Sequence, residues 1–121
     1  MSGGTGDDAL WAGAGSDSVL GGDGNDVLSG EGGNDVLTGG ADADSFVFLE
    51  GFCTDRVTDF LDNVDTLAFG GNYWEGIADA IAFVETYAEV VGSNVVFDFD
   101  DGNVLTVAGA RSLAIFYDDV A

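Results

Sequence analysis

The stretch GGTGDDALWAGAGSDSVLGGDGNDVLSGEGGNDVLTGGADADSFV, residues 3–47, decides the fold. It divides without a gap into five units of nine residues that share the pattern Gly-Gly-x-Gly-x-Asp-x-U-x, where U is a large apolar residue. The sixth position is always aspartate: Asp8, Asp17, Asp26, Asp35 and Asp44. The eighth position is always apolar: Leu10, Val19, Leu28, Leu37 and Phe46. A fixed period of this kind is typical of a solenoid, in which each repeat is stabilised by stacking on its neighbours.

Each unit combines a glycine-rich turn with a short strand. Glycine adopts positive φ without steric cost, so Gly-Gly-x-Gly lets the backbone fold tightly with its carbonyl groups facing inward. Side chains alternate in direction along a strand, so only the eighth position needs to face an interior. Because strands this short cannot stand alone, we expect them to stack about 4.8 Å apart in two parallel sheets around a thin core.

The spacing of the aspartates predicts a cation site. If each unit makes half a coil, successive turns alternate between the two edges of the stack, which pairs Asp8 with Asp26, Asp26 with Asp44, and Asp17 with Asp35. Carboxylates held that close repel one another, and a hard divalent cation between the turns removes the repulsion. Calcium accepts six to eight carboxylate and carbonyl oxygens. Magnesium needs a more compact octahedron, and the turns lack the nitrogen and sulfur ligands that zinc and copper favour.

These units resemble the RTX (repeats-in-toxin, haemolysin-type) calcium-binding repeat. The resemblance implies a mainly β fold, a right-handed parallel β-roll followed by a C-terminal β-rich cap with one helix. It also implies about three calcium ions, each held between one turn and the next but one by sixth-position aspartates and glycine-rich carbonyls. The middle turn would serve two ions through the backbone carbonyls of Gly21, Gly22, Asp23 and Gly24. Three residues stand where the pattern has glycine: Ala12, Glu31 and Asp42.

Residues 48–121 lose the nine-residue period and are predicted to form the cap, with the roll over 3–47. Strands are expected at 45–49, 55–60 and 64–69, and a hairpin over about 94–108 around Asp101-Gly102.

An apolar stripe predicts one helix over about 73–91, formed by Ile77, Ile81, Val84, Ala88 and Val91. The stripe would pack against the sheet, with binding of a partner as the alternative. Asp59, Asp62 and Asp65 either hold a further ion or face water as turn carboxylates. Cys53 has no second cysteine to pair with, and we expect it to be a small buried apolar residue.

The charge balance and the missing residue types exclude several classes of partner and activity. The chain of 121 residues has 23 acidic and two basic residues, a net charge of −21, which argues against nucleic acid and anionic membrane as partners and for cations. No stretch reaches 18 apolar residues, so stable membrane insertion is not expected. Acidity that serves only solubility would not place an aspartate at every ninth position. Histidine is absent, as are the HExxH and GxSxG motifs, so catalysis by this chain alone is not expected.

The last 28 residues, NVVFDFDDGNVLTVAGARSLAIFYDDVA, resemble the C-terminal cap of bacterial RTX proteins that leave the cell through the type I secretion machinery. The family carries its uncleaved export signal there, and residues 1–4 show no basic start of a conventional secretory signal. We therefore expect a secreted, monomeric module that folds on binding calcium. The alternatives are the terminal domain of a secreted protease, lipase or epimerase, and a calcium-rigidified adhesin or surface-layer spacer.

Overall fold

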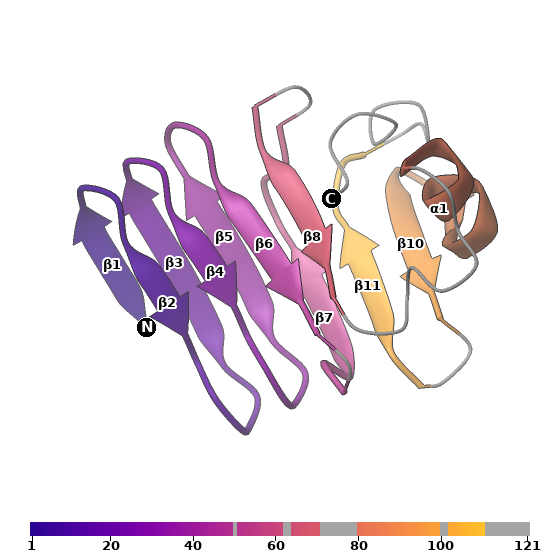
Figure 1. The fold of residues 1–121 in the computed structure, drawn as a ribbon, viewed down its shortest axis with the longest axis horizontal. Helices are drawn as coiled ribbons and strands as arrows, with labels where there is room; N and C mark the ends of the chain where they lie inside the picture. Colours follow the sequence, from indigo (N-terminus) through magenta and orange to yellow (C-terminus); the bar gives the residue numbers. More distant parts are fainter. Residues whose placement is uncertain (50, 62–63, 71–79, 100–101, 111–121) are drawn as a thin grey trace.

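The chain forms two β-sheets that lie against each other, with one helix at the C-terminal end of the stack (Figure 1). The computed structural model describes residues 1–49, 51–61, 64–70, 80–99 and 102–110. The larger sheet contains, in spatial order, β1 (Ser2–Thr5), β3 (Ser18–Asp23), β5 (Val36–Gly40), β7 (Thr54–Val57), β11 (Val104–Val107), β10 (Asn94–Asp98) and β9 (Ala88–Val91). The smaller sheet contains β2 (Ala9–Trp11), β4 (Val27–Ser29), β6 (Ser45–Phe48) and β8 (Thr66–Phe69).

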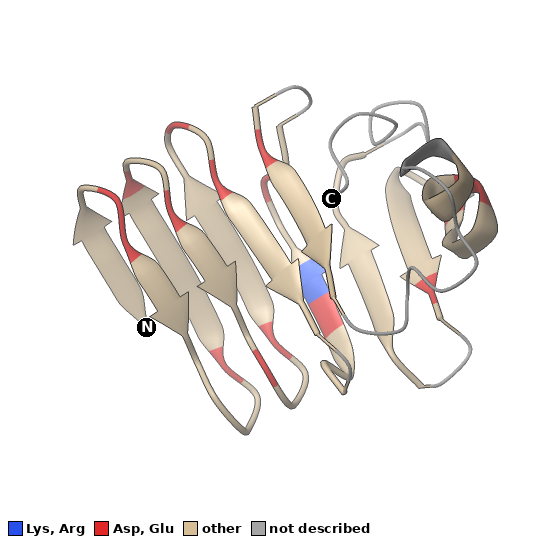
Figure 2. Cartoon of the chain, viewed as in Figure 1, with Lys and Arg blue, Asp and Glu red and all other residues tan. Residues whose placement is uncertain are grey.

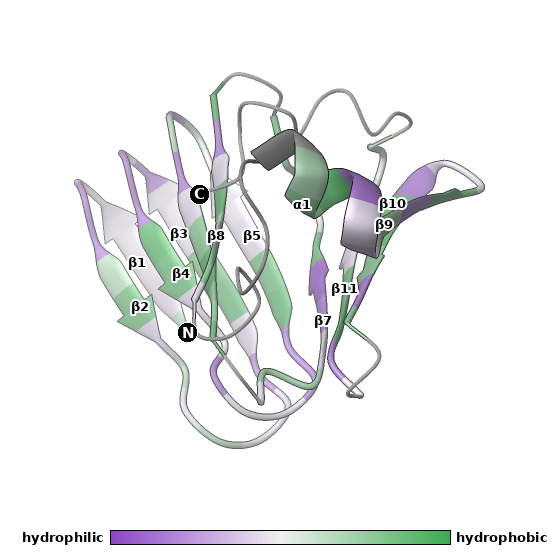
Figure 3. Ribbon diagram, turned by 45° about the vertical axis from the view of Figure 1, so that its right-hand side comes forward, coloured by the Kyte–Doolittle hydropathy of each residue, from purple (hydrophilic) through white to green (hydrophobic). Residues whose placement is uncertain are grey.

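From β1 to β8 the chain changes sheet at every turn, and each strand pairs in parallel with the strand two before it. Apolar residues at equivalent positions therefore stack in two columns, and green hydrophobic segments recur along neighbouring strands in Figure 3. The column of the smaller sheet contains Leu10, Leu28, Phe46 and Leu67. The column of the larger sheet contains Val19, Leu37, Val57 and Val107. The mainly β, parallel roll predicted from the period is confirmed.

The core thickens at the cap, where aromatic rings replace the thin aliphatic columns. The ring of Phe69 lies at the centre, with its centroid 5.4 Å from that of Phe48 and 4.9 Å from that of Phe83. The ring centroids of Phe97 and Phe99 lie 5.4 Å and 5.3 Å from that of Phe69. This cluster covers the open end of the roll, which a solenoid must shield from water.

The predicted helix over 73–91 is wrong at its C-terminal end. Helix α1 spans Ala80–Tyr87, and residues 88–91 form strand β9, which pairs antiparallel with β10. Val90 and Val91 favour a strand because their branched side chains fit a pleated sheet better than a helix, and Gly92 (φ 64°) turns the chain into β10. The first part of the predicted helix, residues 73–79, lies outside the described residues.

The predicted hairpin around Gly102 is confirmed, since β10 and β11 pair antiparallel with Val95 opposite Val107. Helix α1 lies against β9 and β10, and it is too short to span a membrane, as is every helix within the described residues (Figures 1 and 3). The expectation that Cys53 is a buried apolar residue is wrong, because its side chain is partly exposed in a turn.

Candidate metal centre

Acidic residues gather at the turns along both edges of the roll (Figure 2). The turns that contain Asp8, Asp26 and Asp44 lie at one edge, and those that contain Asp17 and Asp35 lie at the other. This is the alternation that half a coil per unit requires. Aspartates 18 residues apart are thereby neighbours in space.

In Asp26, Asp35 and Asp44, one carboxylate oxygen is held by the preceding turn at the same edge. Asp26 Oδ1 accepts the backbone N–H of Asp8 at 2.8 Å, and Asp44 Oδ1 accepts that of Asp26 at 3.0 Å. At the other edge, Asp35 Oδ1 accepts the N–H of Asp17 at 2.7 Å. The bonds orient the carboxylates identically along each edge, so the three predicted aspartate pairs are brought together.

The second oxygen of each carboxylate is buried and accepts no hydrogen bond. This holds for the Oδ2 atoms of Asp8, Asp17, Asp26, Asp35 and Asp44. The side chains of Asp26, Asp35 and Asp44 are only 1% exposed, so water does not solvate these oxygens. A buried carboxylate oxygen without a partner costs free energy and is rare in folded proteins. The roll therefore presents two rows of oxygens that need a positively charged partner.

Backbone carbonyls share the space around these oxygens. A Cβ atom placed on Gly21 would lie 2.5 Å from Asp26 Oδ2 and 2.5 Å from the carbonyl oxygen of Gly39, in the next turn at that edge. Gly3 has the same surroundings, with Asp8 Oδ2 and the Gly21 carbonyl oxygen each 2.7 Å from such a Cβ. Only glycine leaves this cradle open, and the carboxylate and carbonyl oxygens that line it are the ligands calcium prefers.

The backbone contribution is necessary to any metal site here. Within the described ranges, no three acidic, histidine or cysteine side chains come together as a metal-binding group. A site between two turns therefore has two carboxylates at most and depends on the glycine-rich carbonyls for the rest of its oxygens. Such a set of hard oxygens without nitrogen or sulfur fits calcium and not zinc or copper.

Burial and mutual repulsion disfavour the ionised carboxylates. Burial, and next the carboxylates of Asp65, Asp26 and Asp59, raise the pKa of Asp44 to about 6 despite a hydrogen bond from the Asp26 backbone. Burial likewise raises the pKa of Asp35, with a smaller contribution from Asp17. A bound cation would reverse both effects, because it attracts the charged form.

Two of the three departures from the glycine pattern keep the turn conformation. Glu31 (φ 63°) and Asp42 (φ 71°) adopt positive φ where the other units have glycine. Asp42 also compensates for its Cβ, since its Oδ2 accepts the backbone N–H of Gly24 at 3.1 Å. Ala12 stands at the first position, where positive φ is not required.

The aspartate rows continue beyond the five units. Asp55 Oδ1 accepts the backbone N–H of Asp35 at 2.9 Å, and Asp65 Oδ1 accepts that of Asp44 at 2.9 Å. The sequence predicts Asp55 only as a strand residue. It leaves Asp59, Asp62 and Asp65 open as ligands, and of these Asp62 lies outside the described residues. Both oxygens of Asp59 accept backbone N–H groups, from Gly39 at 2.9 Å and Gly40 at 2.8 Å.

The first part of the chain matches a known protein family. The family model of the RTX calcium-binding nonapeptide repeat (four copies) matches residues 1–28 and 20–51. Together the two matches cover residues 1–51. The RTX segment therefore contains all five of the predicted aspartate ligands, and residues after 51 lie outside the match.

Among solved structures, this chain resembles the extracellular lipase LipA from Serratia marcescens, with a TM-score of 0.64 and 28% identity. The match covers 96% of this chain and 19% of the lipase chain, so this chain spans about a fifth of that enzyme's length. The AlgE6R3 subunit of the Azotobacter vinelandii mannuronan C5-epimerase is 25% identical over 98% of this chain and 80% of its own, but its TM-score of 0.37 is too low to indicate a shared fold. The chain matches no curated protein sequence.

Proposed function

We propose that this chain is a calcium-dependent folding module of a protein exported by type I secretion. The observation that carries the proposal is the pair of rows of buried Oδ2 atoms that lack hydrogen-bond partners. The RTX roll over 3–47 would bind the ions, and the cap over 48–121 would close the roll and carry the export signal. The module would stay unfolded in the calcium-poor cytosol and fold after export.

The ligands would come from the pairs Asp8 with Asp26, Asp26 with Asp44, and Asp17 with Asp35. The backbone carbonyls of Gly21, Gly22, Asp23 and Gly24 would complete the two sites that share Asp26. Calcium, when bound, supplies the positive charge that these oxygens lack. In each pair, the turn of the first aspartate holds the carboxylate of the second through its Oδ1, which orients the Oδ2 of Asp26, Asp35 and Asp44 in the folded roll.

The energy available from three ions is sufficient to decide folding. Extracellular calcium modules bind with Kd of about 10⁻⁴–10⁻³ M. At free calcium ten times Kd, one site stabilises the folded state by about 1.4 kcal/mol, and three sites by about 4 kcal/mol. This is comparable with the whole stability of a small domain. A chain with a net charge of −21 and 20 glycines needs such a contribution, because self-repulsion and glycine entropy oppose compaction.

The lipase likeness favours a second candidate at the level of the whole protein. This chain would then be the calcium-binding part of a larger secreted enzyme whose catalytic residues lie elsewhere. A catalytic motif in sequence adjoining residues 1–121 of the full gene would support it, whereas further repeats or adhesion domains would support a structural parent.

Circular dichroism with and without calcium tests the folding proposal. We expect a β-sheet spectrum in millimolar calcium and a disordered spectrum in excess chelator, with magnesium unable to replace calcium at the same concentration. A β-sheet spectrum that persists unchanged in chelator would contradict the proposal.

A further inference from the structure

We propose a fourth calcium site between the turn of residues 30–35 and the turn of residues 51–55, with Asp35 and Asp55 as its carboxylates. The inference rests on the proposed function and extends it past the five glycine-rich units. Nothing in residues 51–55 (GFCTD) reads as a repeat, because only one glycine remains and two extra residues precede it. The structure nevertheless gives this segment the geometry of a sixth repeat.

The backbone of the segment follows the conformation of the repeats. In the middle unit, the second and fourth positions are Gly22 (φ 105°) and Gly24 (φ 111°). The equivalent residues here are Gly51 (φ 82°) and Cys53 (φ 65°). Cysteine rarely adopts positive φ, so its neighbours must impose it.

The cap supplies that constraint. The backbone N–H of Cys53 donates to the side-chain Oδ1 of Asn103 at 2.8 Å, and its carbonyl oxygen accepts the N–H of Val104 at 2.8 Å. Asn103 is buried at the start of β11, which pairs in parallel with β7. The sixth turn therefore has its shape because the cap holds it, and it does not need the glycines of the other units.

Hydrogen bonds place the segment in the same register as a repeat. The N–H of Thr54 donates to Asn34 Oδ1 at 3.1 Å, as the N–H of Ala43 donates to Asn25 Oδ1 at 3.0 Å. The N–H of Arg56 donates to the carbonyl oxygen of Asp35 at 2.9 Å, which repeats the pattern of the earlier units. Two residues beyond Asp55, Val57 is fully buried in the apolar column of the larger sheet.

Asp55, like the aspartates of the repeats, has a buried carboxylate oxygen without a hydrogen-bond partner. Its side chain is 2% exposed, its Oδ1 accepts the N–H of Asp35, and its Oδ2 is buried without a hydrogen-bond partner. Asp35 likewise has a buried Oδ2 without a partner. The adjacent guanidinium of Arg56 is no substitute, because it does not donate to Asp55 Oδ2 and its residue is exposed.

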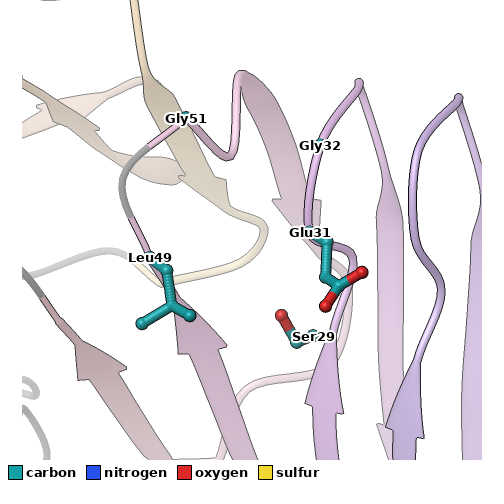
Figure 4. Close-up of a pocket in the computed structure, with 5 residues that line it drawn as sticks. All are labelled: Ser29, Glu31, Gly32, Leu49 and Gly51. Carbon is teal, nitrogen blue, oxygen red and sulfur yellow. The ribbon is translucent and has the colours of Figure 1, made fainter.

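A cavity lies beside the same two turns. This cavity of about 230 Å³ is lined by Ser29, Glu31 and Gly32 on one side and by Leu49 and Gly51 on the other (Figure 4). Glu31 adds a carboxylate to its lining.

The opposite edge of the roll ends differently. Asp65 also continues its row, and its Oδ1 accepts the N–H of Asp44 at 2.9 Å. Its Oδ2, however, accepts the N–H of Leu61 at 2.9 Å. Because backbone donors satisfy both oxygens of Asp65, that row closes without a further cation. The row of Asp17, Asp35 and Asp55 stays open at its last member.

Counting bound calcium on the full chain tests the inference. By native mass spectrometry at saturating calcium, we expect four ions on the unaltered chain and three on Asp55→Asn. The matched control is Glu89→Gln, which makes the same charge change at an exposed position of β9 and should keep four ions. No bound ion on the unaltered chain would overturn the proposed function itself. Three ions on the unaltered chain, or equal counts on the unaltered chain and Asp55→Asn, would overturn the fourth site alone.

A second measurement covers the case in which Asp55→Asn does not fold. A crystal structure of the unaltered chain with terbium should show an anomalous peak between the carboxylates of Asp35 and Asp55. Peaks at the other three aspartate pairs with none at this pair would refute the inference.

Discussion

At the scale of single residues, the roll depends on glycines whose missing side chains leave space for oxygen atoms. Gly21 has no side chain, and this leaves room for Asp26 Oδ2 and the carbonyl oxygen of Gly39 to face the same space. Gly32 belongs to a turn of the same kind but has nothing within 4 Å of where its Cβ would be, and its φ is not positive. Gly21 is therefore required for the space between the turns, whereas a side chain at position 32 can be accommodated.

Gly21→Ala should impair calcium binding, because its Cβ would lie 2.5 Å from two oxygens of the cradle. We expect loss of at least one site, which lowers the stability in calcium by about 1.4 kcal/mol or more. Gly32→Ala is the control and should be neutral or slightly stabilising. Thermal unfolding at fixed calcium measures both. Equal effects of the two substitutions would contradict a specific role for Gly21.

The raised carboxylate pKa values predict that protons compete with calcium. Burial and neighbouring carboxylates raise the pKa of Asp44 to about 6 and that of Asp55 to about 7. In the calcium-free state, protonation of these two carboxyls therefore favours the folded state at low pH, and this contribution to stability is lost as the pH rises through the raised pKa values. The groups that face them are all acidic: Asp26, Asp59 and Asp65 for Asp44, and Asp35 for Asp55. Calcium needs the ionised forms. The calcium concentration at half-folding should therefore rise on going from pH 7.5 to pH 5.5. A pH-independent midpoint in calcium titrations would refute this competition.

At the scale of elements, the cap does more than cover the last strand pair. Its strand β11 extends the larger sheet beside β7, and its aromatic residues fill the end of the roll around Phe69. The same contact region contains Asn103, which holds the turn at Cys53. The folding of the cap and the shape of the last turn are therefore coupled.

Phe69→Ala should unfold much of the cap, because truncation of a buried phenylalanine at the centre of a ring cluster costs about 3–5 kcal/mol. Phe69 is only 4% exposed. The free energy lost on truncating its ring is comparable with the stabilisation expected from three calcium ions. Thermal unfolding in saturating calcium, with Phe69→Leu as the milder control, measures the effect. A melting temperature within a few degrees of the unaltered chain would show that the cap does not depend on this ring.

The end of helix α1 shows where a local pattern misleads. Val84, Ala88 and Val91 continue a helical stripe in the sequence, but only Val84 lies in the helix. Residues 88–91 pair with β10 instead, and Ala88 lies opposite Phe97. Short apolar segments fit either period, and the neighbouring strand edge decides between them.

At the scale of the whole molecule, the fold is a compact arrangement of a chain that carries a net charge of −21. The two rows of aspartates concentrate part of that charge along the edges of the roll, where it can be neutralised by localised cations (Figure 2). Diffuse screening by monovalent salt reduces repulsion between exposed charges but hardly reaches buried ones.

Small-angle X-ray scattering should therefore distinguish calcium from salt. For 121 residues we expect a radius of gyration of about 14 Å when folded and about 35 Å when unfolded. Millimolar calcium should produce the compact value, and 0.5 M sodium chloride with chelator only a partial contraction. Full compaction in sodium chloride alone would show that net charge, and not specific ion binding, controls the fold.

The sequence by itself determined the roll, the two apolar columns and the five aspartates at its edges. It could do so because a strict nine-residue period assigns every turn and every inward side chain locally. Only the tertiary structure decided the place of Asp55 and the end of each row. The turn at Cys53 has positive φ because Asn103, 50 residues away, binds its backbone, and no local pattern contains that contact. Asp55 and Asp65 occupy equivalent positions at the two edges, yet the N–H of Leu61 satisfies the second oxygen of Asp65, whereas the second oxygen of Asp55 is buried without a hydrogen-bond partner.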